Sequence, residues 1–235
     1  AKSGVDASTV AGVGVSAIAP AIVPVDATGR PLRPAILYGI DTRAISQIAP
    51  LQDALGGADA FFNRYGTQLS SQSAAPKICW IRDNEPEVWA HTTRILGAQG
   101  YVVWKLTGEA TIDIYDATTY APLFDPAERV WDPAYADLVA PVEWMARPAW
   151  TCALAGEVHS AAAAETGLRT GTPVITGTAD SPAEAISAGL ASPGDLIIVY
   201  GSSIFFIART EHLPRTRRFW GTTFLEPESY ALTGG

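Results

Sequence analysis

Short apolar runs rich in valine open the chain at Val10–Ser16 and Ala21–Val25. Runs of this length that are bounded by turn residues are typical of β-strands. Asp26–Arg30 predicts a hairpin turn in which Gly29 supplies the permissive backbone. A third strand is predicted at Ala35–Tyr38, so the chain begins with a small group of strands.

Helical periodicity follows these strands. Apolar residues recur at helical spacing from Thr42 to Leu55, and Gly56 ends the pattern. The same reasoning predicts three further helical segments, at Pro76–Ile81, Glu85–Leu96 and Tyr101–Leu106.

The C-terminal third alternates strands with one helix. An apolar run at 173–178 predicts a strand that leads to Asp180, and the helical segment SPAEAISAG follows. LIIVY and IFFIA predict two more strands around the turn GSS. Strands and helices in this mixed order indicate an α/β fold, a mixed sheet with flanking helices.

Composition and charge restrict the function. The chain has 235 residues, of which 48% are hydrophobic, so it can bury a substantial core in one large or two small domains. Its 16 basic and 24 acidic residues give a net charge of -8, and the basic residues are dispersed. We therefore expect no nucleic-acid partner. The 2 cysteines and 3 histidines lack the spacing of a metal site, so no bound structural metal is expected.

The hydropathy of the chain and its N-terminal residues indicate where the protein is located in the cell. No apolar run reaches the roughly 18 residues of a membrane span, and the opening residues lack the regions of a signal peptide. We expect a cytoplasmic protein without a membrane partner. The chain begins without Met, in a segment that resembles the tail of a helix, so we expect a truncated N-terminus.

One glycine motif is weak evidence. Gly12–Ala17 matches the dinucleotide fingerprint G-x-G-x-x-A, which requires a helix directly after the glycines. Pro20 and the hairpin at 26–30 occupy that position instead. The glycines are better interpreted as part of a strand, and a nicotinamide site is not expected.

Asp180 is the strongest candidate for chemistry. It lies between an apolar strand and a helix N-terminus where Ser181, Pro182 and Glu184 form a capping box. Because Ser181 can cap the helix, Asp180 is left free. A carboxylate at the end of such a strand points to the crevice where open α/β sheets bind ligands. A purely structural capping role for Asp180 stays open.

Two further polar groups are ambiguous by themselves. Gly201, Ser202 and Ser203 form either an ordinary hairpin turn or a cradle of N–H groups and hydroxyls for phosphate oxygens. Tyr38 and Asp41 can bind a polyol, although Asp41 can equally cap the next helix.

Together these segments resemble the FGGY carbohydrate kinases, a family that includes xylulokinases, ribulokinases and glycerol kinases. The supporting segments, in order, are GVGVSAIAPAIVPVDATGRPLRPAILYGIDTRA, PKICWIRDNEPEVW, YVVWKLTGEATIDIYDATTYAPLFD, GTPVITGTADSPAEAISAGLASPGD and LIIVYGSSIFFIA. Their collinear order is far more specific than any single motif.

The resemblance implies a ribonuclease H-like fold of the actin and sugar-kinase superfamily. Residues 1–235 are then the first, sugar-binding domain without its opening strands, and an ATP-binding second domain is absent from the chain. The implied activity is ATP-dependent phosphorylation of a sugar or polyol hydroxyl, with ATP and Mg²⁺ as cofactors. The alternative is a noncatalytic sugar-binding or actin-like assembly domain. A homodimer is an option that the sequence leaves open.

The resemblance also assigns roles to residues. Asp180 matches the catalytic base and Ser181 a neighbouring substrate contact. Gly201, Ser202 and Ser203 match a phosphate-binding segment. Further substrate contacts are implied at Tyr38, Asp41 and, by a looser match, Gln72. Ala19 and Pro20 replace the methionine-histidine pair that is usual in xylulokinases, so D-xylulose is not the expected substrate.

Overall fold

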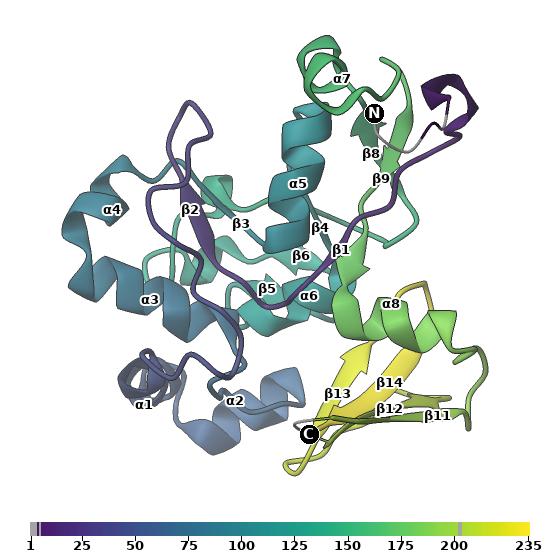
Figure 1. Ribbon diagram of the computed structural model, residues 1–235. Coiled ribbons are helices and arrows are strands. Elements are labelled where there is room, and N and C mark those ends of the chain that lie inside the picture. Colours follow the sequence, from purple (N-terminus) through teal and green to yellow (C-terminus); the bar gives the residue numbers. More distant parts are fainter. Residues whose placement is uncertain (1–3, 5, 202–203) are drawn as a thin grey trace.

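The computed structural model describes residue 4 and residues 6–201 and 204–235. Figure 1 shows a helix-rich part on one side and an antiparallel sheet with α8 packed over it on the other. That sheet has the strand order β11-β12-β14-β13. Its strands are β11 (Leu196–Tyr200), β12 (Ile204–Thr210), β13 (Trp220–Thr223) and β14 (Tyr230–Gly234). The predicted strand pair around residue 201 is confirmed, since β11 and β12 are antiparallel neighbours.

The N-terminal segment runs beside the segment that carries Asp180. β1 (Ser16–Ala17) pairs in parallel with β10 (Thr178–Ala179), and Val13 forms an isolated parallel bridge with Val174. The predicted strand at Val10–Ser16 is thus wrong in extent, because only these separate positions pair. Hydrogen bonds from Ile175 N to Val13 O (3.0 Å) and from Thr178 N to Val15 O (3.1 Å) hold the two segments together.

The predicted helix at 85–96 is wrong in its second half, which forms a β-strand. α4 (Pro86–His91) ends before this segment does, and β3 (Arg94–Leu96) pairs antiparallel with β2 (Val23–Val25). The apolar side chains of Ile95 and Leu96 are buried against this partner rather than on a helix. The predicted third strand at 35–38 is reduced to one bridge, between Ile36 and Ile22.

The remaining strands form small two-stranded sheets. These are β4 (Thr111–Asp113) with β7 (Arg147–Ala149), β5 (Phe124–Asp125) with β6 (Val130–Trp131), and β8 (Leu154–Glu157) with β9 (Pro173–Ile175).

The described helices are mostly short. The α-helices are α1 (Ile48–Asp53), α2 (Ala58–Tyr65), α3 (Ala74–Asn84), α4 (Pro86–His91), α5 (Ala98–Thr107), α6 (Ile114–Ala117), α7 (Ser160–Thr166) and α8 (Asp180–Ser187). The 3₁₀ helices are Ala7–Thr9, Ile45–Gln47, Thr118–Tyr120, Pro133–Tyr135 and Val142–Trp144. The predicted helix at 101–106 lies within α5, and Gly108, with φ 80°, ends that helix.

Separate hydrophobic clusters support the two sides of the molecule. The larger cluster surrounds α3 and includes Phe61, Ile78 and Tyr120. A smaller one joins α8 to the C-terminal sheet through Ala185 and Phe224. Side chains at the edges of both clusters meet at one pocket, which is where the candidate site lies.

Candidate functional site

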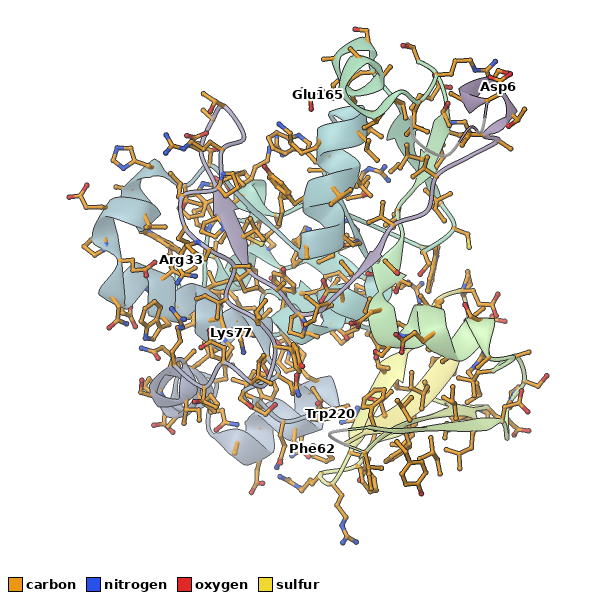
Figure 2. The ribbon with its side chains drawn as sticks, in the orientation of Figure 1. Asp6, Arg33, Phe62, Lys77, Glu165 and Trp220 are labelled. Carbon is orange, nitrogen blue, oxygen red and sulfur yellow. The ribbon has the colours of Figure 1, made fainter. Side chains whose placement is uncertain are left out.

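A pocket of about 510 Å³ lies between α2, α6, the start of α8 and the C-terminal sheet. Figure 2 shows Phe62 and Trp220 where α2 approaches β13. The pocket brings together sequence-predicted residues from distant parts of the chain, namely Tyr38, Gln72, Asp180 and Ser181.

Asp180 is the first residue of α8, and the N-cap is Ala179. This corrects the expected capping box: the helix begins one residue earlier, and Ser181 is not its cap. The Ser181 N–H donates a 2.8 Å hydrogen bond to Oδ1 of Asp180. In the described part of the chain, Oδ2 of Asp180 accepts no hydrogen bond. One oxygen therefore orients the carboxylate, and the other is left without a hydrogen bond from the described residues, at the positive end of a helix and in a residue that lines the pocket.

A tight backbone approach fixes the turn before Asp180. Gly177 has φ 76°, a region that favours glycine, and an added Cβ would lie 2.1 Å from the carbonyl oxygen of Val15. The next residue, Thr178, uses its N–H to bind that same carbonyl at 3.1 Å. The N-terminal segment thereby positions the start of α8.

Sequence reasoning missed two buried acids beside this turn. Asp113 is fully buried, and its Oδ2 accepts a 2.7 Å hydrogen bond from the Thr178 hydroxyl. Asp116 is 2% exposed and lines the pocket. Oδ1 of each acid has no hydrogen-bond partner among the described residues. The available signal was the segment TIDIYDA, which places acids between apolar residues instead of on a polar face.

Burial changes the titration of both acids. It raises the pKa of Asp113 to about 7, although the Thr178 hydrogen bond opposes the shift. Burial, followed by repulsion from Asp113, raises the pKa of Asp116 to about 8. Desolvation disfavours a charged carboxylate that lacks a cation partner, which explains both directions. Burial thus favours the uncharged form of both acids.

Gly39, the residue after Tyr38, links Tyr38 to Gln72 by a hydrogen bond. The Gly39 N–H donates a 3.0 Å hydrogen bond to Oε1 of Gln72. A Cβ at Gly39 would approach the Gln72 side chain to 2.4 Å, so a larger residue here would push the Gln72 carboxamide aside. The Gln72 carboxamide is held in place, and its NH₂ group remains available as a donor.

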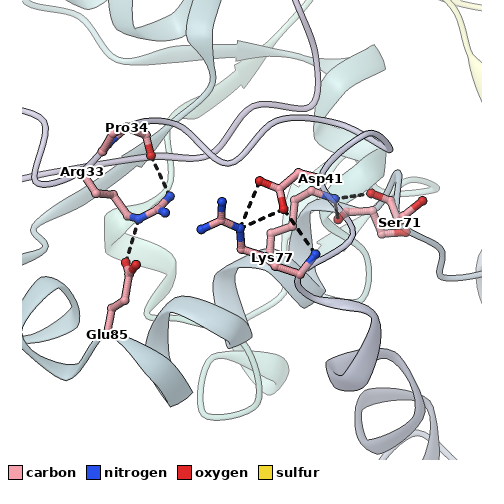
Figure 3. Close-up of polar contacts among 8 residues, drawn as sticks. Arg33, Pro34, Asp41, Ser71, Lys77 and Glu85 are labelled. Atoms are coloured by element: carbon pink, nitrogen blue, oxygen red, sulfur yellow. Dashed lines mark hydrogen bonds and ion pairs between the residues drawn. The ribbon is translucent and has the colours of Figure 1, made fainter.

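Behind Gln72, a buried lysine supports the loop. Lys77 is 1% exposed, and its Nζ donates to the main-chain carbonyls of Ser71 and, at 3.4 Å, Ser73 (Figure 3). Burial lowers the pKa of Lys77 to about 8, and the nearby Asp41 carboxylate partly opposes this shift.

Asp41 lies outside the pocket. Its Oδ1 accepts a 2.8 Å hydrogen bond from Nε of Arg43, and this contact lowers the pKa of Asp41. Figure 3 shows Asp41 beside Lys77. The Asp41 N–H donates a 2.9 Å hydrogen bond to the Tyr38 carbonyl, but the Asp41 carboxylate is bound by Arg43, and Asp41 does not line the pocket with Tyr38, Gln72 and Asp180.

The expected phosphate segment is described only in part. Gly201 is exposed directly after β11 and does not line the pocket, whereas Ile204 at the start of β12 does. Ser202 and Ser203 lie outside the described residues.

Within residues 6–201 and 204–235, no group of 3 or more His, Cys, Asp or Glu side chains could hold a metal ion. None of the helices in these ranges has the length and apolar character needed to cross a membrane.

Comparison with known proteins gives a consistent picture. The N-terminal domain model of the FGGY family of carbohydrate kinases matches residues 1–187. The chain is 30% identical over 183 residues to an autoinducer-2 kinase of Klebsiella pneumoniae, covering 76% of this chain and 33% of that protein. It is also 30% identical over 182 residues to a xylulose kinase of Streptomyces coelicolor, covering 77% and 37% of the two chains.

A solved structure extends the similarity. The crystal structure of xylulose kinase from Rhodospirillum rubrum aligns with a TM-score of 0.88 and 30% identity, over 95% of this chain and 46% of that one. The present chain thus spans about a third of the curated relatives and less than half of this structure.

Proposed function

Because this chain belongs to the FGGY family of carbohydrate kinases, we propose that it supplies the sugar site and the catalytic base for ATP-dependent phosphorylation of a sugar or polyol hydroxyl. The observation that carries the proposal is the position of Asp180, whose free Oδ2 lies at the positive end of α8 in a pocket that also contains Tyr38 and Gln72.

The reaction needs a deprotonated nucleophile. The substrate hydroxyl oxygen attacks the γ-phosphorus of ATP, the bond to the β–γ bridging oxygen breaks, and ADP leaves with that electron pair. The hydroxyl proton passes to Asp180 as general base. The Ser181 N–H on Oδ1 orients the carboxylate for this transfer. Catalysis of this kind depends mainly on positioning and electrostatics.

The remaining roles belong to the same proposal. Tyr38, Gln72 and Ser181 would contact the substrate, and Gly201 with Ser202 and Ser203 would lie near the ATP phosphates. Asp41 would act indirectly, since it pairs with Arg43 outside the pocket. Mg²⁺ is bound in many kinases through the nucleotide phosphates with one or two carboxylates, which suits a pocket with few acids. The fold proposed here is ribonuclease H-like, and residues 1–235 would contribute the first lobe.

The test is Asp180→Asn in a polypeptide extended to the length of the relatives. Asparagine keeps the shape of the side chain but cannot take the proton, so kcat should fall by about 10²- to 10⁴-fold while sugar affinity changes little. Steady-state kinetics and calorimetric sugar binding measure the two quantities. A kcat near that of the unmodified enzyme would remove Asp180 as the base and would favour a binding or structural role.

A further inference from the structure

Several threonine hydroxyls that line the pocket of Asp180 use their own protons inside the protein and can only accept hydrogen bonds from a ligand. Resting on the proposed function, we propose that this pocket selects uncharged sugars or polyols, bound through their hydroxyl protons, and excludes sugar acids and sugar phosphates. The placement of hydroxyl protons, the charges in and around the pocket, and its apolar wall support this selection.

The threonine hydroxyls of the pocket already use their protons within the protein. Thr118 and Thr119 donate to the main-chain carbonyls of Tyr115 (2.8 Å) and Asp116 (2.7 Å). Thr222 donates to the adjacent main-chain carbonyl at 3.0 Å. The 3.3 Å contact between Thr118 and Thr222 also keeps a proton inside the protein, whichever hydroxyl donates.

Each hydroxyl has a single proton and two lone pairs. The pocket threonines that donate to carbonyls therefore present acceptors to a ligand. A sugar hydroxyl can donate to these acceptors, whereas a carboxylate or phosphate oxygen has no proton to offer at neutral pH. These threonine acceptors thus match a polyol and not an anion, whereas the Gln72 NH₂ group can donate to either.

The charges lining the pocket point the same way. Among the described residues that line it, the charged types are Asp116 and Asp180, and there is no lysine, arginine or histidine. An anionic substrate would lie beside Asp180 without a compensating cation, and it would also face the negative γ-phosphoryl group. Burying an unpaired charge is strongly unfavourable.

Four basic side chains on segments that neighbour the pocket are engaged elsewhere. Arg43 pairs with Asp41 at 2.8 Å, and Arg217 pairs with Asp59 at 2.7 Å. Arg215 donates to main-chain carbonyls near the end of α2. The buried lysine of α3 points to the carbonyls of its own loop. To reach a bound anion, each would have to give up these contacts.

The apolar wall of the pocket offers no hydrogen-bond partner to an anion. Ile18, Ala19, Pro20, Phe61 and Leu69 line part of the pocket with side chains that form no hydrogen bonds. A carboxylate turned toward this wall would lose its hydration without gaining a partner. The C–H faces of a neutral sugar can pack against the same wall.

The experiment compares probes that differ only in charge. Ketopentoses and pentitols are titrated calorimetrically into the 235-residue chain beside the corresponding pentonates, in which a carboxylate replaces one CH₂OH group. We expect at least one neutral compound to bind and its pentonate to bind on the order of 100-fold more weakly. A pentonate that binds as tightly as its pentitol would overturn the inference and leave the proposed function standing. Binding of neither class would contradict both.

A charge variant tests the cause. Gln68 lines the pocket at a half-buried position, so Gln68→Lys should strengthen pentonate binding by about tenfold or more, as expected for a new charge-assisted contact. Gln68→Met, which has similar length and no charge, is the matched control and should not. Equal effects of the two substitutions would show that size and not charge sets the selection.

Discussion

The Thr178 hydroxyl donates a 2.7 Å hydrogen bond to Oδ2 of Asp113. Thr178 lies two residues before Asp180, the proposed catalytic base. Asp113 is fully buried, so this hydrogen bond cannot be replaced by water. The buried acid thus anchors the strand end from which Asp180 projects.

Removal of this donor should destabilise the protein and displace Asp180. Thr178→Val keeps the shape and leaves Oδ2 of Asp113 unpaired, at a cost of about 1–3 kcal/mol. Thr178→Ser retains the hydroxyl and should restore much of the loss. Urea unfolding measures stability, and kcat in the extended enzyme measures alignment. If valine and serine behave alike, the hydrogen bond does not anchor the strand.

The two buried acids predict an unusual pH dependence. The pKa values of Asp113 and Asp116 are raised from 3.8 to about 7 and about 8. Between pH 4 and 8 the folded state therefore binds more protons than the unfolded state, and stability contributed by this pair falls as pH rises.

Asp113→Asn should flatten this decline, because asparagine does not titrate. The free energy of unfolding, measured in urea at several pH values from 5 to 8, reports the slope. Asp137→Asn removes an exposed carboxylate and serves as the control, with the slope unchanged. An unaltered slope in Asp113→Asn would show that this acid is ionised throughout the range.

Lys77 should cause the opposite dependence of stability on pH, in a higher pH range. Burial lowers its pKa from 10.5 to about 8. Between these values the unfolded state binds more protons, so stability contributed by Lys77 rises with pH. Lys77→Met should abolish that rise.

The same substitution should weaken sugar binding. Without the ammonium group, the carbonyls of Ser71 and Ser73 lose their donor, and the loop that places Gln72 loosens. Loss of one such buried contact corresponds to about a tenfold weaker affinity. Lys105→Met changes an exposed lysine and is the control for both measurements. Unchanged sugar affinity in Lys77→Met would limit this lysine to a role in stability.

The sequence predicted the elements whose local signals agree with their environment. β11, β12 and α5 have apolar runs or periodicity bounded by turn residues, and Asp180 stands out because a strand and a helix meet there. The resemblance to sugar kinases also indicated Gln72, and the structure adds its partner, Gly39. These predictions required only short stretches of chain.

The features that sequence reasoning missed depend on distant contacts. Ile95 and Leu96 fit a helical pattern equally well, and only pairing with β2 makes them a strand. Asp113 and Asp116 look like solvent-exposed acids because local patterns assign polar residues to the surface. Their burial results from packing of α6 against β10 and β4, and its local sign is limited to the apolar neighbours of the acids in TIDIYDA.

Gly177 allows the sharpest test of how the fold positions Asp180. Alanine there would be strained by the φ of 76° and would also bring Cβ to 2.1 Å from Val15 O. Gly167, with φ 78° and no atom within 4 Å of its added Cβ, has the same backbone conformation in open space. Gly167→Ala should therefore cost only the backbone strain, about 1 kcal/mol.

Gly177→Ala should cost clearly more, because relief of the clash requires the β1 segment to move away from β10. This movement would break the 3.1 Å hydrogen bond from Thr178 N to Val15 O and release the start of α8. We expect a loss of several kcal/mol in urea unfolding, on the scale of other overpacking and strain effects. In the extended enzyme kcat should fall with it, while Gly167→Ala keeps its kcat. Equal losses for the two glycines would mean that only backbone strain matters and that contact with Val15 does not hold Asp180 in place.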